Sequence, residues 1–429
     1  MNKILLLKGG RVIDPASKLD GAMDVLVENG VITGVAPKIE REGAKVLNLE
    51  GLWVLPGLID IHVHFREPGY EYKETIATGS AAAVAGGFTQ VCCMANTMPV
   101  NDTGAITAFI LQRGKEAKGA IVHPVGAVTK GLKGESMAEM GDMAEMGAVA
   151  FSDDGNPVSN SEMMRRGLEY AKGLGKPVFS HPQDPLLTAG GCMHEGEVST
   201  RLGLKGMPAA GEEAMIARDL LLAAETGTRV HLQHVSTARG VSLLRWAKET
   251  GIPYSAEATP HHLALTHHEM EGYNTNAKVN PPLRTEEDRQ AVAEGVREGV
   301  IQVIATDHAP HSVLEKDVEF EAAAFGISGI ETALSVLLSL VEKGELALER
   351  LVHALTTAPA EVIGIPTPAI AEGRAANITV VNPNLRWTPT PEGLRSKGKN
   401  SPWLGRPLKG RAVYTIVEGE VRYRLEETK

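Results

Sequence analysis

Apolar and polar residues alternate in short runs at both ends of the chain, and glycine, asparagine and proline separate the runs. They lie at residues 4–7, 24–27, 31–35, 377–381 and 413–417. Alternation with a period of two is typical of strands that bury one face. We therefore expect residues 1–53 and residues 366–429 to build one small β-sandwich together.

Between these ends, short apolar runs alternate with longer stretches of helical periodicity. Residues 212–226 and 238–249 are two such stretches, with apolar residues three and four positions apart. The short apolar runs that qualify as strands are residues 58–63, 88–94, 120–125, 148–152, 177–180, 229–233, 253–256 and 301–306.

Continuous apolar strands that alternate with helices predict a parallel sheet covered by helices. Eight such units over residues 54–365 favour the α/β class and a (β/α)8 TIM barrel, with the β-sandwich beside it. A doubly wound open sheet is the main alternative. It is disfavoured because no GxGxxG motif follows the first strand.

Composition excludes several classes of function. The 429 residues are 43% apolar and 22% charged, as in a globular protein with a large core. The net charge of −10 includes no basic block, so neither a nucleic acid nor a membrane is an expected partner. Three cysteines are too few for a disulfide framework, and no apolar stretch has the length of a membrane span or a signal core. We therefore expect a cytoplasmic protein.

The first predicted strand ends in His62-Val63-His64, which suggests a metal site. Residues two apart in a strand point to the same face, so both imidazoles can reach one ion at about 2.0–2.1 Å. Alone the motif is weak, since the chain has 14 histidines. However, His181, His234 and Asp307 also follow predicted strands, and in a barrel these ends converge on one site.

The fourth predicted strand ends in Asp153-Asp154-Gly155, which offers a carboxylate to the same site. A carboxylate there could bridge two metal ions. We favour Asp154 as this ligand, whereas for Asp153 a turn closed by Gly155 is as good an explanation as chemistry. His261 and His262 are adjacent and therefore point apart, so we expect them to be structural.

Four motifs in order resemble those of one family. They are DIHVHFREPG at residues 60–69, MANTMP at 94–99, FSDDG at 151–155 and ATDHAPH at 305–311. They are similar to the dihydroorotases, closest to the bacterial type I enzymes of the metal-dependent amidohydrolase superfamily. The resemblance covers nearly the whole chain. It implies a zinc-dependent barrel enzyme that reversibly opens L-dihydroorotate to N-carbamoyl-L-aspartate in de novo pyrimidine (UMP) biosynthesis.

The resemblance also implies roles for the candidate ligands. His62 and His64 would bind one zinc ion, His181 and His234 the second, and Asp154 would bridge them. Many relatives bridge with a carboxylated lysine, but the fourth strand here offers none. The family implies one or two zinc ions, and we favour two. Asp307 would be a ligand and would also move the proton after hydroxide held by the metal attacks the cyclic amide.

Substrate contacts follow from the same resemblance. Arg66 would bind the substrate carboxylate, since a guanidinium matches a carboxylate with two parallel hydrogen bonds. The residues 312–324 would form a mobile lid, with an ordinary surface loop as the alternative. The remaining contacts implied for the substrate are His64, Asn96, Asn280, His311 and the backbone at Phe325 and Gly326.

Two other functions remain open at this point. A hydantoinase or allantoinase would share the fold, although Arg66 and the missing bridging lysine argue against it. A non-catalytic dihydroorotase-like scaffold for aspartate transcarbamoylase is the other, and the intact ligand set argues against that. The resemblance also allows a homo-oligomer, and an association of an active enzyme with aspartate transcarbamoylase.

Overall fold

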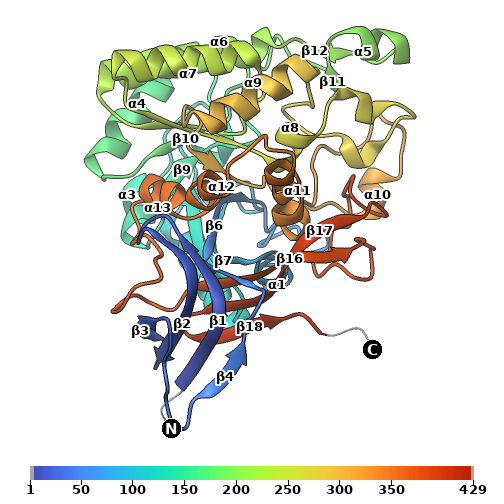
Figure 1. Cartoon of the computed structure of the whole chain (residues 1–429). Helices are drawn as coiled ribbons and strands as arrows, with labels where there is room; N and C mark the ends of the chain where they lie inside the picture. The colour runs from blue at the N-terminus through green and yellow to red at the C-terminus, as the bar shows by residue number, and fades with distance from the viewer. Residues whose placement is uncertain (1–3, 427–429) are drawn as a thin grey trace.

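Eight parallel strands form the centre of the structure, a computed structural model that describes residues 4–426 (Figure 1). Each strand is hydrogen-bonded to the next in chain order. A bridge between Val63 and His308 joins the first strand to the segment after the last, so the sheet nearly closes into a barrel. The strands are β6 (Leu58–Val63), β7 (Phe88–Cys93), β8 (Ile121–Gly126), β9 (Ala150–Ser152), β10 (Val178–Ser180), β13 (Val230–Leu232), β14 (Tyr254–Ala258) and β15 (Val303–Ile304).

All eight strands overlap the predicted ones, and the predicted TIM barrel is confirmed. Helices alternate with them and cover the barrel (Figure 1). The helices are α1 (Ile76–Gly86), α2 (Gly104–Ala117), α3 (Met140–Glu145), α4 (Ser161–Gly173), α5 (Glu197–Leu202), α6 (Ala210–Thr226), α7 (Ala238–Thr250), α8 (Pro260–Ala264), α9 (Glu286–Arg297), α10 (Val313–Lys316), α11 (Ile330–Glu342), α12 (Leu348–Leu355) and α13 (Thr357–Ile363). Within residues 4–426, no helix combines the length and the hydropathy that crossing a membrane requires.

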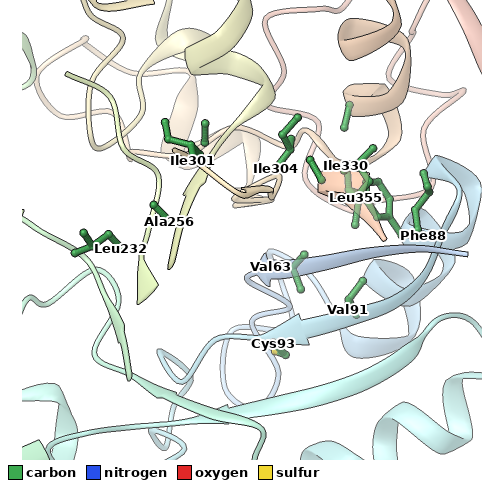
Figure 2. Close-up of a cluster of buried hydrophobic side chains, with 14 of the residues drawn as sticks. Val63, Phe88, Val91, Cys93, Leu232, Ala256, Ile301, Ile304, Ile330 and Leu355 are labelled. Carbon is green, nitrogen blue, oxygen red and sulfur yellow. The ribbon is translucent and has the colours of Figure 1, made fainter. Parts of the chain in front are cut away.

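The main core lies between the barrel strands and the helices around them. Val63 and Val91 on neighbouring strands belong to the same buried cluster as Ile330 of α11 and Leu355 of α12 (Figure 2). Strands β6 and β7 are buried along their whole length. Burial on both faces explains why most residues of these two strands are apolar.

The two ends of the chain build one β unit beside the barrel, as predicted, and the strands of the expected sandwich are hydrogen-bonded into a single sheet (Figure 1). Its order is β18-β17-β16-β5-β1-β2-β3, with β4 paired to β1. Residues 1–3 and 427–429 of the expected unit lie outside the described residues. The expected boundary after residue 53 falls within β5, so the exact domain limits stay a prediction. The strands are β1 (Ile4–Asp14), β2 (Leu19–Glu28), β3 (Val31–Ala36), β4 (Lys45–Asn48), β5 (Trp53–Pro56), β16 (Ile378–Trp387), β17 (Leu408–Val417) and β18 (Glu420–Arg424).

Part of the C-terminal segment leaves this sheet and reaches the barrel. Between β16 and β17, the hydroxyl of Ser396 donates to the buried carboxylate of Glu74, which lies just before α1. Gly398 packs so closely on Pro310 and His311 that a Cβ atom there would lie 2.7 Å from the His311 nitrogen. The segment from residue 394 to 403 therefore contacts the barrel next to the loop that follows β15.

Two buried threonines join the terminal sheet to the barrel. Thr379 on β16 donates its hydroxyl to the carbonyl of Gly87 at 2.6 Å and accepts from the N–H of Leu58 at 3.3 Å. Thr415 on β17 donates to the carbonyl of Val84 at 2.6 Å. Both carbonyls lie at the C-terminal end of α1, where the last carbonyls lack the regular N–H donor four residues on. The threonines of the terminal sheet thus satisfy main-chain groups of the barrel across the junction.

We expect Thr379→Val to lower the free energy of unfolding by about 1–3 kcal/mol, because an isosteric side chain leaves two buried backbone groups unpaired. Urea unfolding measures this change. Thr33→Val is a matched control, since Thr33 is exposed on β3 and its substitution should cost less than about 0.5 kcal/mol. Equal losses in the two variants would contradict the role given to Thr379.

Candidate active site

The six candidate metal ligands lie at the carboxyl ends of the barrel strands, and all are buried. The ligand atoms of His62, His64 and Asp154 lie within 4.8 Å of one another, and so do those of Asp154, His181 and His234. The structure thus brings together residues that are far apart in the sequence. They are His62 and His64 at β6, Asp154 after β9, His181 after β10, His234 after β13 and Asp307 after β15.

The carboxylate of Asp154 lies between two pairs of imidazoles. Its Oδ2 atom is 3.3 Å from His64 Nε2 and 3.5 Å from His62 Nε2. Its Oδ1 atom is 3.2 Å from His181 Nδ1 and 3.4 Å from His234 Nε2. Ligands about 2.0–2.1 Å from a tetrahedral zinc ion lie roughly 3.4 Å from one another. Each carboxylate oxygen therefore stands at ligand spacing from one histidine pair.

Asp307 faces only the first of these pairs. Its Oδ1 atom is 3.1 Å from His64 Nε2 and 3.5 Å from His62 Nε2. The residue has a φ of 48°, and Arg66 and His234 also have positive φ values, of 61° and 34°. Such backbone conformations cost energy in residues other than glycine and cluster at functional sites.

The remaining hydrogen bonds of the histidines show that these residues fit a divalent metal ion. His62 Nδ1 is 2.5 Å from Glu257 Oε1, and His64 Nδ1 is 2.9 Å from Asn96 Oδ1. His181 Nε2 is likewise 3.0 Å from Gln183 Oε1. These oxygens accept the ring N–H, so the opposite nitrogen of each of these three rings faces a carboxylate oxygen. Each such nitrogen can hold a cation between itself and the carboxylate, either a proton or a metal ion that two rings share.

The electrostatics of the site agree with a cation-binding role. Burial alone would raise the pKa of Asp154, but His62 and the other facing imidazoles hold this pKa well below its usual range. Burial opposes the protonation of His62, yet the carboxylates around it, that of Glu257 first, hold the pKa of His62 well above the ordinary value. The cluster therefore concentrates negative charge among nitrogen ligands.

The structure distinguishes the two aspartates of the fourth strand end. The carboxylate of Asp153 accepts hydrogen bonds from the N–H groups of Val128 and Thr129 at 2.8 and 3.0 Å, and from the Thr129 hydroxyl. These contacts occupy both of its oxygens and hold a loop. Asp153 therefore has a structural position, whereas Asp154 faces the histidines.

The other histidine pair is also explained. His262 Nε2 lies 3.0 Å from the carbonyl of Pro281, and its Nδ1 lies 2.8 Å from the Thr259 hydroxyl. These contacts secure the start of α8 against a neighbouring loop. The structural role expected for His262 is confirmed, and neither His261 nor His262 belongs to the metal-type groups found among the described residues.

A cavity of about 200 Å³ opens beside the cluster. Its lining includes the charged residues Asp154 and Asp307 and the apolar residues Val279 and Ala309. Every residue predicted to contact a substrate lines it: His64, Arg66, Asn96, Asn280, His311, Phe325 and Gly326.

Arg66 supplies the positive charge of this cavity. Its Nε atom donates to the carbonyl of Pro310 at 3.3 Å. Among residues 4–426, no carboxylate forms an ion pair with its guanidinium, although Asp307 and Asp154 are close enough to act on it through space. Burial lowers its pKa from the ordinary value. A half-buried guanidinium without a paired anion is suited to receive one from a ligand.

His311 and the backbone beyond the 312–324 loop form the part of the cavity wall next to Arg66. His311 Nε2 lies 2.8 Å from the carbonyl oxygen of Phe325. Burial and the neighbouring Arg66 lower the pKa of His311 to about 3, so the ring is neutral and donates this hydrogen bond. The N–H of Gly326 donates to the carbonyl of Lys278 at 2.9 Å. These backbone groups are therefore engaged within the protein.

Sequence reasoning missed the residues that orient the ligands. Glu257 on β14 accepts from His62 Nδ1 and lies 3.0 Å from His231 Nε2. Asp60 accepts from the N–H and hydroxyl of Thr306, so it joins the first strand to the segment that carries Asp307. In the sequence, the only indication of a role for Glu257 is that it is a single acidic residue near the end of a strand.

The fold and this site define a barrel hydrolase of the metal-dependent amidohydrolase class. A family model described as dihydro-orotase-like matches residues 51–239. A dihydroorotase of Syntrophus aciditrophicus (strain SB) is 51% identical over 421 residues, with 98% of this chain and 99% of the relative covered. A dihydroorotase of Anaeromyxobacter dehalogenans (strain 2CP-C) is 52% identical, with 98% of each covered. The chain belongs to the dihydroorotase family.

Solved structures of hydantoinases have the same fold. The L-hydantoinase (dihydropyrimidinase) of Arthrobacter aurescens superimposes with a TM-score of 0.87 at 25% identity, with 100% of this chain and 98% of that chain covered. The D-hydantoinase (dihydropyrimidinase) of a Thermus species gives 0.81 at 25% identity, with 98% and 95% covered. The sequence is thus much closer to the dihydroorotases than to these hydantoinases.

We expect Glu257→Gln to lower the affinity for a divalent metal by about 10–100-fold, because the amide removes the charge that orients and polarises His62. Titration of the metal-free protein with zinc measures this affinity. Glu331→Gln is a control, since Glu331 is also buried but accepts from the N–H groups of Arg395 and Ser396. An unchanged affinity in Glu257→Gln would contradict the role given to this carboxylate.

Proposed function

We propose that this chain catalyses the reversible conversion of N-carbamoyl-L-aspartate to L-dihydroorotate, the ring-closing step of pyrimidine (UMP) biosynthesis. The observation that carries the proposal is the position of Arg66, a cation without a paired carboxylate that lines the same cavity as the histidine and aspartate cluster. A substrate with a carboxylate beside a cyclic amide matches both features. Identity of about 50% to dihydroorotases over nearly the full chain supports it.

The donor set favours two zinc ions. His62, His64 and Asp307 would hold one, His181 and His234 the other, and Asp154 would bridge them. Imidazole nitrogens with a few carboxylate oxygens suit zinc better than magnesium or calcium. When bound, zinc lowers the pKa of a coordinated water to about 7 and polarises a carbonyl oxygen. The donor spacing around Asp154 supports this arrangement.

Asp307 is the residue we assign to proton transfer. Burial would raise its pKa, but the facing His62 and His64 lower it well below the ordinary range, so the carboxylate begins ionised. In ring opening it accepts a proton from the attacking water and passes it to the ring nitrogen as the C–N bond breaks. In ring closure the same carboxylate accepts the proton of the attacking ureido nitrogen and passes it to the oxygen that leaves as water, so Asp307 begins and ends each direction ionised.

Substrate recognition would begin at Arg66, whose guanidinium can donate two parallel hydrogen bonds to the carboxylate. Asn280 Oδ1 is buried and has no hydrogen-bond partner within the described residues, so a ring N–H of the substrate would satisfy it. Asn96, which lines the same cavity and also holds His64, would contribute a further contact. His311, Phe325 and Gly326 would shape the wall next to Arg66.

The hydantoinase interpretation fits less well. Hydantoin and its simple analogues carry no carboxylate, so Arg66 would remain without an anion. A non-catalytic scaffold is also a poorer explanation, because the ligand set is complete and its orienting residues are present.

An assay of the zinc-loaded protein in both directions tests the function. We expect the protein to convert L-dihydroorotate and also N-carbamoyl-L-aspartate. Liquid chromatography measures both conversions. Hydantoin should have a kcat/KM about 10–100-fold lower because it lacks the charged contact to Arg66. The Asp307→Asn variant serves as the inactive control, since an amide cannot carry the proton. Turnover of hydantoin at a rate equal to that of dihydroorotate would move the assignment to the hydantoinases.

We expect Arg66→Lys to raise the KM for dihydroorotate by about 10–100-fold with a smaller change in kcat, because an ammonium cannot form the paired hydrogen bonds. Steady-state kinetics and zinc content measure both effects, and the zinc content should not change. Arg165→Lys is the matched control, since Arg165 pairs with exposed glutamates on α4. A KM equal to that of the parent would rule out the carboxylate contact.

A further inference from the structure

Asn400 from the C-terminal segment is fully engaged with the wall of the cavity. Its side chain is 3% exposed. The Oδ1 atom accepts from the N–H of His311 at 2.8 Å. The Nδ2 group donates to the carbonyl of Ala309 at 3.0 Å and to that of Gly326 at 2.9 Å. One amide thus satisfies three main-chain groups that belong to other parts of the chain.

These three main-chain groups come from two segments that line the cavity. Ala309 and His311 follow β15, whereas Gly326 lies beyond the 312–324 loop. Gly326 has a φ of 143°, and a Cβ atom there would lie 2.7 Å from the Ala309 oxygen. The two backbones can approach this closely only because residue 326 is glycine. The Asn400 amide cross-links them at that point.

The segment formed by residues 309–311 also supports Arg66. The guanidinium donates to the carbonyl of Pro310, which stands between the two residues held by Asn400. A shift of Ala309 and His311 would therefore move a contact that holds the guanidinium in the cavity. Asn400 itself does not line the cavity, so its effect on a substrate must pass through these neighbours.

A second buried donor shares the carbonyl of Gly326. Lys316 of α10 is 5% exposed, and its Nζ atom donates to the carbonyls of Gly326 at 3.1 Å and Ala324 at 2.7 Å. Among residues 4–426, Lys316 has no carboxylate in an ion pair with it. Burial lowers the pKa of Lys316 to about 7, and its Nζ atom donates to main-chain carbonyls. The Gly326 carbonyl therefore accepts hydrogen bonds from both Asn400 and Lys316.

We propose that Asn400 is a positioning residue for substrate binding: it holds the two segments of the cavity wall in register with Arg66. The inference rests on the proposed function, because it assigns the wall to a carboxylate-bearing substrate. Without the amide, the wall loses the three hydrogen bonds of Asn400 and keeps those from Ala309 to Ile327 and from His311 to Phe325, while the metal ligands keep their own contacts. Substrate affinity should therefore suffer more than turnover.

The test compares Asn400→Ala with the parent enzyme in its zinc-loaded form. We expect the KM for dihydroorotate to rise about 10-fold, since buried main-chain groups lose their partner, with kcat reduced less and zinc content unchanged. Hydrogen exchange of the peptide from 309 to 327 should become faster. Asn382→Ala is the control: Asn382 caps a turn in β16, accepting from Asn384 and Leu385, away from the cavity.

Lys316→Met is a second variant that removes a hydrogen bond from the same wall. It keeps the test decisive if Asn400→Ala does not fold. It should raise KM and speed exchange in the same peptide. In the double variant the rise in KM should be smaller than the product of the single effects, because both side chains act on the Gly326 carbonyl. Independent, fully multiplicative effects would contradict the shared role.

Two outcomes separate this inference from the proposed function. If the parent enzyme does not convert dihydroorotate, the proposed function fails, and the exchange experiment still decides whether Asn400 holds the wall. If the parent is active and Asn400→Ala leaves both KM and exchange at residues 309–327 unchanged, the positioning role is overturned.

Discussion

The structure depends on one electrostatic constraint: the imidazole nitrogens of two histidine pairs face the oxygens of a single buried carboxylate. Positive charge between Asp154 and these histidines, carried by a proton or a metal ion, stabilises the carboxylate in this position. Ionisable groups are costly to bury, so the surrounding protein must fix each ring in the orientation that makes a cation favourable. Much of the polar interior of the barrel serves that requirement.

The orienting groups of His62, His64 and His181 differ in charge. His62 rests on the buried carboxylate of Glu257, which adds negative charge behind the ring, whereas His64 and His181 rest on neutral amides. The site therefore increases the basicity of one ligand much more than that of the others. Asn96 has two roles, since it lines the cavity and also accepts a hydrogen bond from His64. Substrate binding and ligand orientation are joined at this residue.

The sequence was sufficient for the barrel and for most of the site. Eight apolar runs became strands because both faces of each are covered, and ligands at strand ends meet because a barrel gathers those ends. Glu257, Asn400 and Lys316 could not be found in this way. Their importance lies in contacts with residues distant in sequence, which no local period or motif records. The choice between Asp153 and Asp154 likewise needed the position of Thr129.

The contribution of the C-terminal segment has a consequence for protein synthesis. All six candidate ligands precede residue 308, so a nascent chain carries the complete donor set long before residue 400 leaves the ribosome. The wall that Asn400 holds is assembled only afterwards, together with the last strands of the terminal sheet. The ability to bind metal and the ability to select a substrate would therefore arise at different times during folding. Substrate selection would require the complete polypeptide.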